Sequence, residues 1–342
     1  MKVLFSQGQT VTLGELPVPK LEAGDLLLKV NACGVCVSDL HKLRFRSLDK
    51  PTVLGHEIAG TVLKVGAGAN KFREGERVVL AHHVPCLTCH YCRRGNYSMC
   101  PQFRKTGLDP GGFSEYVRVP ALHVQNVTFP IPDRLSDGEA CFMEPLGCCL
   151  RDIKRIHLQA GDTAVIVGLG SIGILLGQLV KAFGGECFGV ELDPVRRRLA
   201  ESFGFFGTAE GFTPESKLRL AKVTQGRGAD VVIITAGRPA MVPEAISWLR
   251  DGGTLNVFAS FHPDSRLDLD WNQLYYREIN MISSYSPSPA DLCEALGLLA
   301  DGKVRVDRLA AARFPLGRFS DALESLEKRT ILKAIMTPHG DN

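Results

Sequence analysis

Four cysteines in one short segment constrain this chain more than any other feature. They follow the spacing C-x2-C-x2-C-x7-C and are Cys86, Cys89, Cys92 and Cys100. A loop with this spacing can fold back and present four thiolates to one tetrahedral ion, and zinc prefers such soft sulfur ligands. Because four thiolates fill a tetrahedron, the segment predicts a closed, structural zinc site. Three nearby histidines could compete as ligands: His82, His83 and His90.

The overall composition is that of a globular chain with about two domains. The chain has 342 residues, of which 45% are hydrophobic and 23% are charged, and a domain commonly holds about 100–200 residues. The formal net charge of +3 is too small to indicate binding to nucleic acid or to a charged membrane surface. No apolar run approaches the roughly 20 residues of a membrane-spanning helix. We therefore expect no nucleic-acid partner and no membrane association.

Cysteine usage and the N-terminal segment favour a reducing compartment. Eleven cysteines could form disulfides in a secreted protein. However, residues 1–10 lack a basic region followed by an apolar stretch, so no secretory signal is visible. Four of the cysteines also have a zinc spacing. We expect reduced thiols and a cytoplasmic location.

The first part of the chain, to about residue 145, is rich in short β-type segments. They are separated by turns rich in glycine and proline, such as Gly66-Ala67-Gly68 and Gly111-Gly112. This pattern predicts a compact, mostly β domain. The expected strands are Leu26–Val30, Ile58–Val65, Arg77–Leu80 and Tyr116–Val119.

Strand and helix patterns then alternate, which predicts an α/β domain: a doubly wound parallel sheet with helices on both faces. The expected strands are Thr163–Val167, Cys187–Val190, Val231–Thr235 and Thr254–Phe258. The expected helices are Ile172–Phe183, Pro194–Phe203 and Val242–Arg250, followed by Ala290–Ala300 and a closing segment that ends in Ile331–Met336.

A glycine-rich loop links the first of these strands to the first helix. It reads Gly168-Leu169-Gly170-Ser171-Ile172-Gly173. A lone G-x-G-x-x-G is a weak signal, but here it has a strand before it and a helix after it. The first glycine permits a tight turn, the second lets a pyrophosphate approach the backbone, and the third allows close helix–sheet packing. The N–H groups that open the helix favour phosphates, so the loop predicts a dinucleotide site.

An acidic residue after the second strand bears on the choice of dinucleotide. Glu191 follows the strand Cys187–Val190, 18 residues after Gly173. Its carboxylate can accept hydrogen bonds from both ribose hydroxyls and would repel a 2′-phosphate, so we expect NAD rather than NADP. Three consecutive arginines, Arg196, Arg197 and Arg198, argue the other way, since one of them could reach a phosphate.

A second set of residues suits a catalytic metal, which needs about three protein ligands and one open position. Cys36 and His56 are the first two candidates. Glu144 is the best candidate for the third ligand, and Glu57, which is next to His56, is the other. Each residue also has a structural explanation when taken alone. A lone cysteine is usually a core residue, a lone histidine usually makes a hydrogen bond, and Glu144 could cap a helix or form a salt bridge.

Taken together, these motifs resemble the zinc-dependent medium-chain dehydrogenases, the family of alcohol, sorbitol and threonine dehydrogenases. The resemblance covers nearly the whole chain in the family's order. Its carriers are Cys36-Val37-Ser38-Asp39, Gly55-His56-Glu57-Ile58-Ala59-Gly60, the four-cysteine segment, Gly111-Gly112-Phe113-Ser114-Glu115-Tyr116, Glu144-Pro145-Leu146 and the glycine loop. An acidic residue at the position of Glu144 is typical of the polyol, glucose and threonine branches, so simple primary alcohols are less favoured as substrates.

The resemblance implies a discontinuous fold. It predicts a GroES-like catalytic domain over residues 1–146, a Rossmann NAD-binding domain over residues 147–287, and a return to the catalytic domain over residues 288–342. It also implies two zinc ions per chain, one catalytic and one structural, and a homo-oligomer, either a dimer or a tetramer. The expected partner is a small-molecule alcohol.

The chemistry implied is the reversible oxidation of a secondary alcohol to a ketone, with NAD as hydride acceptor and zinc as Lewis acid. Ser38, two residues after Cys36, is placed to accept a hydrogen bond from the substrate hydroxyl. By resemblance, a proton relay then passes through a ribose hydroxyl to His41. Asp39 could orient His56, because ligating histidines usually donate their other N–H. By resemblance again, Lys333 matches a basic position that faces the pyrophosphate.

Other functions are open to a chain with this fold. Zinc-free quinone or enone reductases and non-enzymatic, crystallin-type proteins share it, but those lineages typically lack the metal ligands that Cys36, His56 and Glu144 would supply. An NAD-binding sensor with only the structural zinc is a further alternative. Metal content separates the cases, since two zinc ions per chain indicate the dehydrogenase and one indicates a structural site alone.

Overall fold

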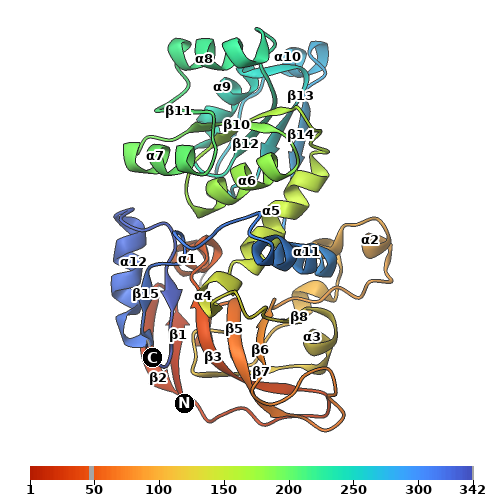
Figure 1. Ribbon diagram of the computed structural model, residues 1–342, viewed down its shortest axis with the longest axis vertical. Helices are drawn as coiled ribbons and strands as arrows, with labels where there is room; N and C mark the ends of the chain where they lie inside the picture. The colour runs from red at the N-terminus through yellow and green to blue at the C-terminus, as the bar shows by residue number, and fades with distance from the viewer. Residues whose placement is uncertain (46–49, 341–342) are drawn as a thin grey trace. The chain divides into compact units, whose positions relative to one another are not determined.

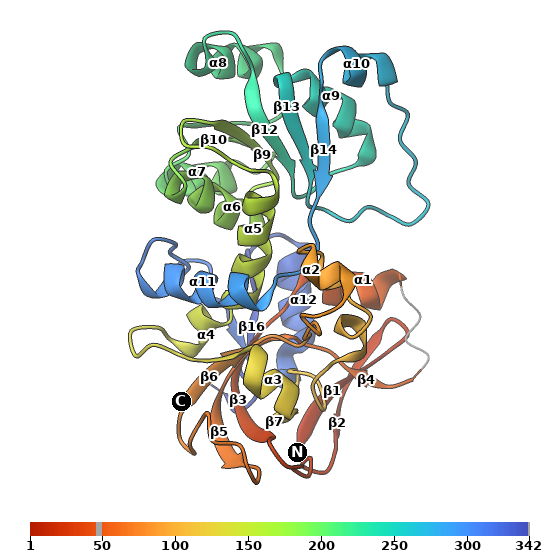
Figure 2. The same ribbon diagram turned by 90° about the vertical axis from the view of Figure 1, so that its right-hand side faces the viewer.

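The computed structural model describes residues 1–45 and 50–340, and these divide into two units. Unit 1 consists of Met1–Gly147 together with Pro287–Asn342, and unit 2 is Cys148–Ser286. Figures 1 and 2 show the mostly β character of unit 1 and the alternation of helices and strands in unit 2. No helix in the described ranges combines the length and the apolar character needed to cross a membrane.

Unit 1 is built around a seven-stranded sheet whose order is β15-β16-β3-β5-β6-β8, with β7 paired to β3. A smaller sheet has the order β2-β1-β4. The predicted mostly β domain is therefore confirmed. The strands are β1 (Lys2–Gln7), β2 (Thr10–Glu15), β3 (Leu26–Gly34), β4 (Thr52–Val53), β5 (Glu57–Val65), β6 (Arg77–Leu80), β7 (Tyr116–Val119), β8 (Thr128–Pro130), β15 (Arg313–Phe314) and β16 (Ile335–Met336).

Strand β3 lies at the centre of the large sheet because it pairs with β5, β7 and β16. Apolar residues along it are fully buried, including Leu26, Leu28 and Val30. They join a core that extends to Ile58 on β5 and to Phe113. Burial of this apolar surface contributes about 25 cal/mol per Å², and it holds the ends of β3 and β5 in a fixed relation to each other.

The helices of unit 1 are short, apart from four that have nine or more residues. The α-helices are α1 (Val37–Phe45), α2 (His90–Arg93), α3 (Ala121–Asn126), α4 (Asp137–Ala140), α5 (Met143–Arg155), which continues into unit 2, α11 (Pro289–Ala300) and α12 (Phe319–Glu327). The 3₁₀ turns are η1 (Tyr97–Met99), η2 (Phe103–Lys105) and η4 (Leu316–Arg318).

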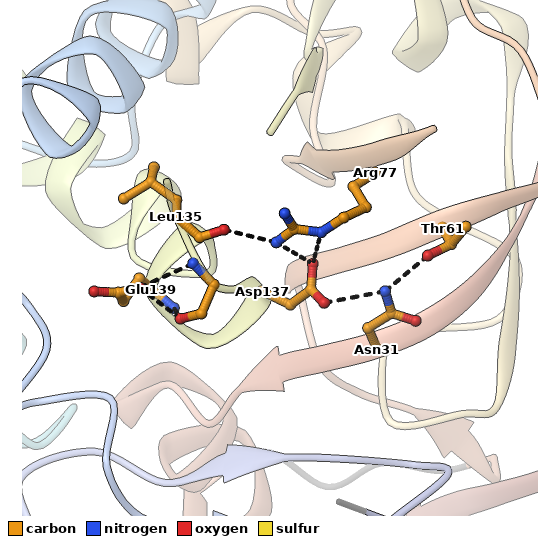
Figure 3. Close-up of polar contacts among 7 residues, drawn as sticks. Asn31, Thr61, Arg77, Leu135, Asp137 and Glu139 are labelled. Atoms are coloured by element: carbon orange, nitrogen blue, oxygen red, sulfur yellow. Dashed lines mark hydrogen bonds and ion pairs between the residues drawn. The ribbon is translucent and has the colours of Figure 1, made fainter. Parts of the chain in front are cut away.

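A polar network attaches α4 to the large sheet (Figure 3). Asn31 Nδ2 donates to Thr61 Oγ1 at 2.8 Å and to Asp137 Oδ2 at 3.2 Å. Arg77 donates to the other oxygen of Asp137 through Nε, at 3.1 Å, and to the carbonyl of Leu135 through Nη2, at 2.7 Å. The chain that leads to α5 is therefore held against β3, β5 and β6.

Unit 2 is a parallel sheet of six strands in the order β11-β10-β9-β12-β13-β14. In order of appearance along the chain this is 3-2-1-4-5-6, the strand order of a Rossmann fold. The predicted doubly wound α/β domain is confirmed. The strands are β9 (Thr163–Val167), β10 (Glu186–Val190), β11 (Gly207–Ala209), β12 (Ala229–Ile234), β13 (Leu249–Val257) and β14 (Asn280–Ser283).

The helices of unit 2 include the three that were predicted, and one of those three ends earlier than expected. They are α6 (Ser171–Ala182), α7 (Pro194–Ser202), α8 (Pro214–Thr224), η3 (Pro239–Met241), α9 (Val242–Ser247) and α10 (Trp271–Tyr276). The helix predicted to reach Arg250 ends at Ser247 instead. Leu249 pairs with Ala229 in the sheet, and Arg250 forms an ion pair with Asp230. Pairing with β12 therefore overrides the local helical pattern.

Candidate active site and metal centres

The four predicted cysteines of the structural site lie together. Their Sγ atoms are all within 4.8 Å of one another, with 4.0 Å between Cys86 and Cys92 and 3.6 Å between Cys89 and Cys92. A zinc–sulfur distance of about 2.3 Å places the sulfurs of a tetrahedral site about 3.8 Å apart. The observed spacing therefore fits zinc, and the chemistry of four thiols supports the same metal.

Backbone N–H groups point at two of these sulfurs. Cys89 N–H donates to Cys86 Sγ, and Cys86 N–H donates to Cys100 Sγ, both at 3.3 Å. Hydrogen bonds from Thr88, together with that of Cys89, lower the pKa of Cys86 to about 6. Burial, helped by the neighbouring thiols, raises the pKa of Cys92 to about 12. The backbone N–H groups of this segment are thus arranged to stabilise thiolates. A bound cation would be required to ionise all four cysteines together.

Of the residues predicted to hold the catalytic metal, Cys36, His56 and Glu57 lie in one group, and Glu144, the favoured third ligand, is not part of it. One ligand atom from each lies within 4.8 Å of the other two. The register of the sheet explains this, because Gly34 at the end of β3 pairs with Glu57 at the start of β5. The chain leaving β3 therefore reaches Cys36 beside the chain that enters β5. A half-buried thiol together with a buried imidazole and a buried carboxylate is a ligand set typical of zinc.

Asp39 contacts the side of His56 that carries Nδ1. The distance from Nδ1 to Asp39 Oδ1 is 3.3 Å, and Asp39 is fully buried. Burial by itself would lower the pKa of His56, but the Asp39 carboxylate and the Cys36 thiol raise this pKa well above its usual value. Because Nδ1 faces Asp39, Nε2 is the nitrogen left to a metal, as expected for an orienting carboxylate.

Glu57 also pairs with a lysine from the C-terminal segment. Lys333 Nζ forms an ion pair with Glu57 Oε2, and both side chains are buried. Although burial opposes it, the Glu57 carboxylate raises the pKa of Lys333 to about 12. Within the described residues, Glu57 Oε1 has no hydrogen-bond partner. A buried carboxylate oxygen without a partner is costly, and a metal ion would satisfy it.

A glycine makes room for this ion pair. A Cβ on Gly34 would lie 1.9 Å from Glu57 Oε2 and 3.0 Å from Lys333 Cε. The sequence predicted Lys333 at a pyrophosphate. In the structure its ammonium is engaged by Glu57, so that role stays a prediction. Glu144, the third ligand that the sequence favoured, is 5% exposed near the start of α5 and contributes to the raised pKa of Lys333.

The two residues predicted to move the proton lie on α1, on the chain that leaves Cys36. Ser38 is exposed and its N–H donates to Cys36 Sγ at 3.5 Å, while His41 is half-buried. Asp39, between them, is turned inward. Helix α1 therefore carries Asp39, which contacts His56, together with Ser38 and His41, whose side chains are suited to proton transfer.

In unit 2 the glycine loop has the expected geometry. Gly168 has φ +90°, and a Cβ there would lie 2.8 Å from Ala236 Cβ. A Cβ on Gly173 would lie 2.0 Å from the carbonyl oxygen of Gly168, so helix α6 can pack onto the loop only with glycine at this position. No described side chain caps the N-terminus of α6 at Gly170. The first-turn N–H groups, which include Ser171 and Ile172, are therefore suited to phosphates.

Glu191 is connected to this loop by hydrogen bonds. Its Oε2 accepts from Leu169 N–H at 2.9 Å, and its Oε1 accepts from Asp193 N–H at 3.1 Å. The three arginines separate in the structure. Arg197 donates to the carbonyl of Glu191 at 2.7 Å, Arg198 is exposed, and Arg196 Nη1 lies 4.0 Å from the Cβ position of Gly170. Only Arg196 among them stands next to the glycine loop.

Comparison with known proteins agrees with this arrangement. The alcohol dehydrogenase GroES-like domain matches residues 22–133, and the zinc-binding dehydrogenase domain matches residues 171–301. Sorbitol dehydrogenase from Bacillus subtilis (strain 168) is 31% identical over 339 residues, covering 96% of this chain and 94% of that protein. The chain belongs to the zinc-dependent medium-chain dehydrogenases.

Two further similarities concern the branch and the cofactor of this medium-chain dehydrogenase. D-arabitol-phosphate dehydrogenase from Enterococcus avium is 31% identical, covering 94% of this chain and 92% of that protein. A zinc-binding dehydrogenase from Sinorhizobium meliloti 1021, solved bound to NADP, is 27% identical with a TM-score of 0.87, covering 98% of this chain and 99% of that one. The predicted membership and polyol branch are confirmed, as is a dehydrogenase that uses zinc and a nicotinamide dinucleotide.

The structure of this dehydrogenase also shows site residues that the sequence analysis missed. Gly34 was not singled out, although the Glu57–Lys333 pair depends on its missing side chain. His82 was considered as a competitor at the cysteine segment, but its ring lies 4.6 Å from the ring of His56. The signal available in the sequence was a pair of adjacent histidines two residues after the strand Arg77–Leu80.

Proposed function

We propose that this enzyme oxidises a secondary hydroxyl of an open-chain polyol or polyol phosphate to a ketone, reversibly, with NAD as hydride acceptor. The observation that carries the proposal is the group of Cys36, His56 and Glu57, whose ligand atoms lie within 4.8 Å of one another and could hold one metal ion. The substrate class is supported by the relatives named for sorbitol and for arabitol phosphate.

We assign the catalytic metal to Cys36, His56 and a carboxylate. Glu57 supplies that carboxylate in the present arrangement, and Glu144, buried near the start of α5, is the residue with which it would exchange. When bound, zinc supplies a Lewis acid for the substrate oxygen, and NAD accepts the hydride. Asp39 holds His56 in the orientation that leaves Nε2 to the metal.

We assign the proton path to α1. The exposed Ser38 hydroxyl accepts the hydrogen bond of the substrate hydroxyl, and the half-buried His41, three residues further on, passes the proton to solvent. An imidazole suits this step because its ordinary pKa of about 6.5 lies near neutrality.

NAD is expected to be preferred over NADP because of Glu191. A carboxylate held by Leu169 and Asp193 stands where the ribose of a dinucleotide lies in this fold, and a 2′-phosphate would approach it closely. Arg196 next to Gly170 is the group that would favour NADP. Gly168, Gly170, Ser171, Ile172 and Gly173 would bind the pyrophosphate.

The test is a screen of the purified, zinc-loaded enzyme against sorbitol, xylitol, arabitol and their phosphates, with 2,3-butanediol and threonine as non-polyol alternatives. Each substrate is offered with NAD and with NADP. We expect the highest kcat/KM for a polyol or its phosphate with NAD. Cys36→Ser serves as the control and should abolish that rate.

Two results would count against the proposal. A higher kcat/KM for threonine or butanediol than for every polyol would overturn the substrate class. An equal or higher kcat/KM with NADP would mean that Arg196 outweighs Glu191, and would overturn the cofactor preference alone.

We further infer a homo-oligomer, a dimer or a tetramer, and a cytoplasmic location. Exposed aromatic residues on α10 support the first inference, since Trp271, Tyr275 and Tyr276 are 74%, 76% and 80% exposed and large exposed apolar patches mark interfaces. Light scattering that gives the mass of one chain would contradict it. The second inference rests on eleven free cysteines, and localisation of a tagged chain tests it.

A further inference from the structure

Four aromatic rings form a row inside unit 1. The ring of Phe103 lies 4.8 Å from that of His83, which lies 3.8 Å from that of His82, and His82 lies 4.6 Å from His56. The first and last of these centroid distances lie at the lower end of the 4.5–7 Å range of packed aromatic pairs, and the distance between His82 and His83 is shorter. The row runs from the four-cysteine segment to the candidate catalytic group, because Phe103 packs against that segment and His56 belongs to that group.

The Phe103 end of the row is part of the structural zinc site. Phe103 is 2% exposed and packs in one cluster with Cys92 and Cys100. The chain just after it is bound to the histidine pair. Thr106 accepts from His83 Nδ1 through its carbonyl at 2.8 Å, and from Val84 N–H through its hydroxyl at 2.9 Å. The cysteine segment and the two histidines are therefore joined by hydrogen bonds and by ring packing.

The His56 end of the row is positioned by the sheet. Ile58 on β5 pairs with Leu80 on β6, so His56 and His82 lie two residues beyond a paired position on neighbouring antiparallel strands. The carbonyl of His82 accepts from His123 Nε2 at 3.0 Å, which fixes the backbone at this point. His82 thus has a defined position from which its ring can limit the orientation of His56.

We propose that His82 and His83 are positioning residues that link the structural zinc segment to the catalytic metal ligand His56. The inference rests on the proposed assignment of Cys36 and His56 as ligands of the catalytic metal. Asp39 holds one edge of the His56 imidazole, at 3.3 Å, and the His82 ring packs against it. With both contacts present, the His56 imidazole keeps one orientation and its Nε2 points in one direction. Without the row of rings, the imidazole would be free to tilt.

The proposal predicts a specific effect on metal retention. Removing a group that orients a metal ligand typically weakens metal binding by about 10–100-fold. Truncating His83 should therefore release the catalytic metal faster, although His83 is not itself assigned as a ligand. A side chain that only fills space would lower the melting temperature and leave the metal environment as it was.

The experiment uses the full-length enzyme with cobalt in the catalytic site and zinc in the four-cysteine site. Visible absorption of the cobalt reports the ligand geometry, and the rate of cobalt loss to EDTA reports retention. The variants are His83→Ala, which interrupts the row, and His83→Phe, which keeps a ring in it. His90→Ala is the matched control, since His90 lies on α2 of the same segment, where it contacts Arg94 and Tyr91 outside the row.

We expect His83→Ala to shift the cobalt spectrum and to speed cobalt loss by about 10-fold. His83→Phe should restore most of the wild-type behaviour, and His90→Ala should match the wild type. If His83→Ala keeps the wild-type spectrum and release rate, or if His90→Ala changes them equally, the proposal is overturned. If His83→Ala does not fold, Phe103→Leu, which keeps apolar volume but removes the ring, takes its place with the same expectations.

Cys36→Ser separates this proposal from the assignment of the metal ligands. If Cys36→Ser binds the second cobalt with an unchanged spectrum, the ligand assignment is wrong. If it loses that cobalt while His83→Ala retains it normally, the ligand assignment stands and the link through the histidines is refuted.

Discussion

At the scale of single residues, two carboxylates are candidates to complete the proposed catalytic metal site. Glu57 shares the ligand group with Cys36 and His56 but is also paired with Lys333. Glu144→Ala should lower kcat by about 10-fold or more, because loss of a residue that supports a metal site typically lowers activity on this scale. It should leave NAD affinity and the four-cysteine zinc unchanged.

Lys333→Met separates the two carboxylates. Without the ammonium, Glu57 would be a buried, unpaired carboxylate and should depend more strongly on the metal. We expect the variant to lose thermal stability when the catalytic zinc is removed by chelation, more than the wild type does. Glu144→Ala with near wild-type turnover would exclude Glu144 from the site. Paired measurements of zinc stoichiometry and activity decide the matter.

At the scale of elements, a buried acid joins helix α5 to strand β13. Asp152 Oδ1 accepts from Asn256 Nδ2 at 2.8 Å, while Asp152 Oδ2 and Asn256 Oδ1 have no hydrogen-bond partner in the described ranges. Burial raises the pKa of Asp152 to about 7. This pKa exceeds the value of about 4 for aspartate in the unfolded chain. The contribution of Asp152 to the free energy of unfolding is therefore fully present at low pH and is lost as pH rises through 7.

Asp152→Asn should remove this dependence, because an amide stays neutral and can donate to Asn256 Oδ1. Relative to the wild type, we expect the variant to gain about 2 kcal/mol between pH 5.5 and pH 8.5. Melting temperatures at both pH values measure the change. Asp301→Asn is the control, since Asp301 is largely exposed. A wild-type stability profile in Asp152→Asn would mean that Asp152 is already ionised in the folded protein.

At the scale of the whole molecule, the metal ligands and the dinucleotide loop belong to different units. Every candidate ligand lies in unit 1, and the glycine loop lies in unit 2, which has its own core around β9, β10 and β12. Removal of both zinc ions should therefore lower the melting temperature of unit 1 and change NAD affinity by less than about 3-fold, since structural zinc sites contribute folding energy directly.

Calorimetry and NAD titration of the chelated protein test this separation. Gly173→Val tests the converse, because a side chain at this position meets the carbonyl of Gly168. This variant should lose NAD binding and keep both zinc ions. Cys89→Ser should lower the unit 1 transition alone. Loss of NAD binding on chelation would show that the two units depend on each other.

Much of this protein could be predicted from its sequence because the relevant signals are local. The C-x2-C-x2-C-x7-C spacing brings four sulfurs together within one loop, and the glycine loop lies between a strand and a helix that form from their own periodicity. Strands such as Arg77–Leu80 and Tyr116–Val119 have their predicted bounds. By contrast, the prediction that α9 ends at Arg250 was wrong, because pairing with β12 competes with helix formation there.

The four-cysteine site, the dinucleotide loop and the two kinds of domain could be predicted from the sequence, since each depends on residues that are close along the chain. The residues proposed for the catalytic metal are distant along the chain, and it is the tertiary fold that brings such side chains together. The β3–β5 register brings Glu57 to Cys36, and β16–β3 pairing brings Lys333 to Glu57. The β5–β6 register brings His82 to His56. Strand register depends on packing across the whole sheet, and no short segment of sequence specifies it.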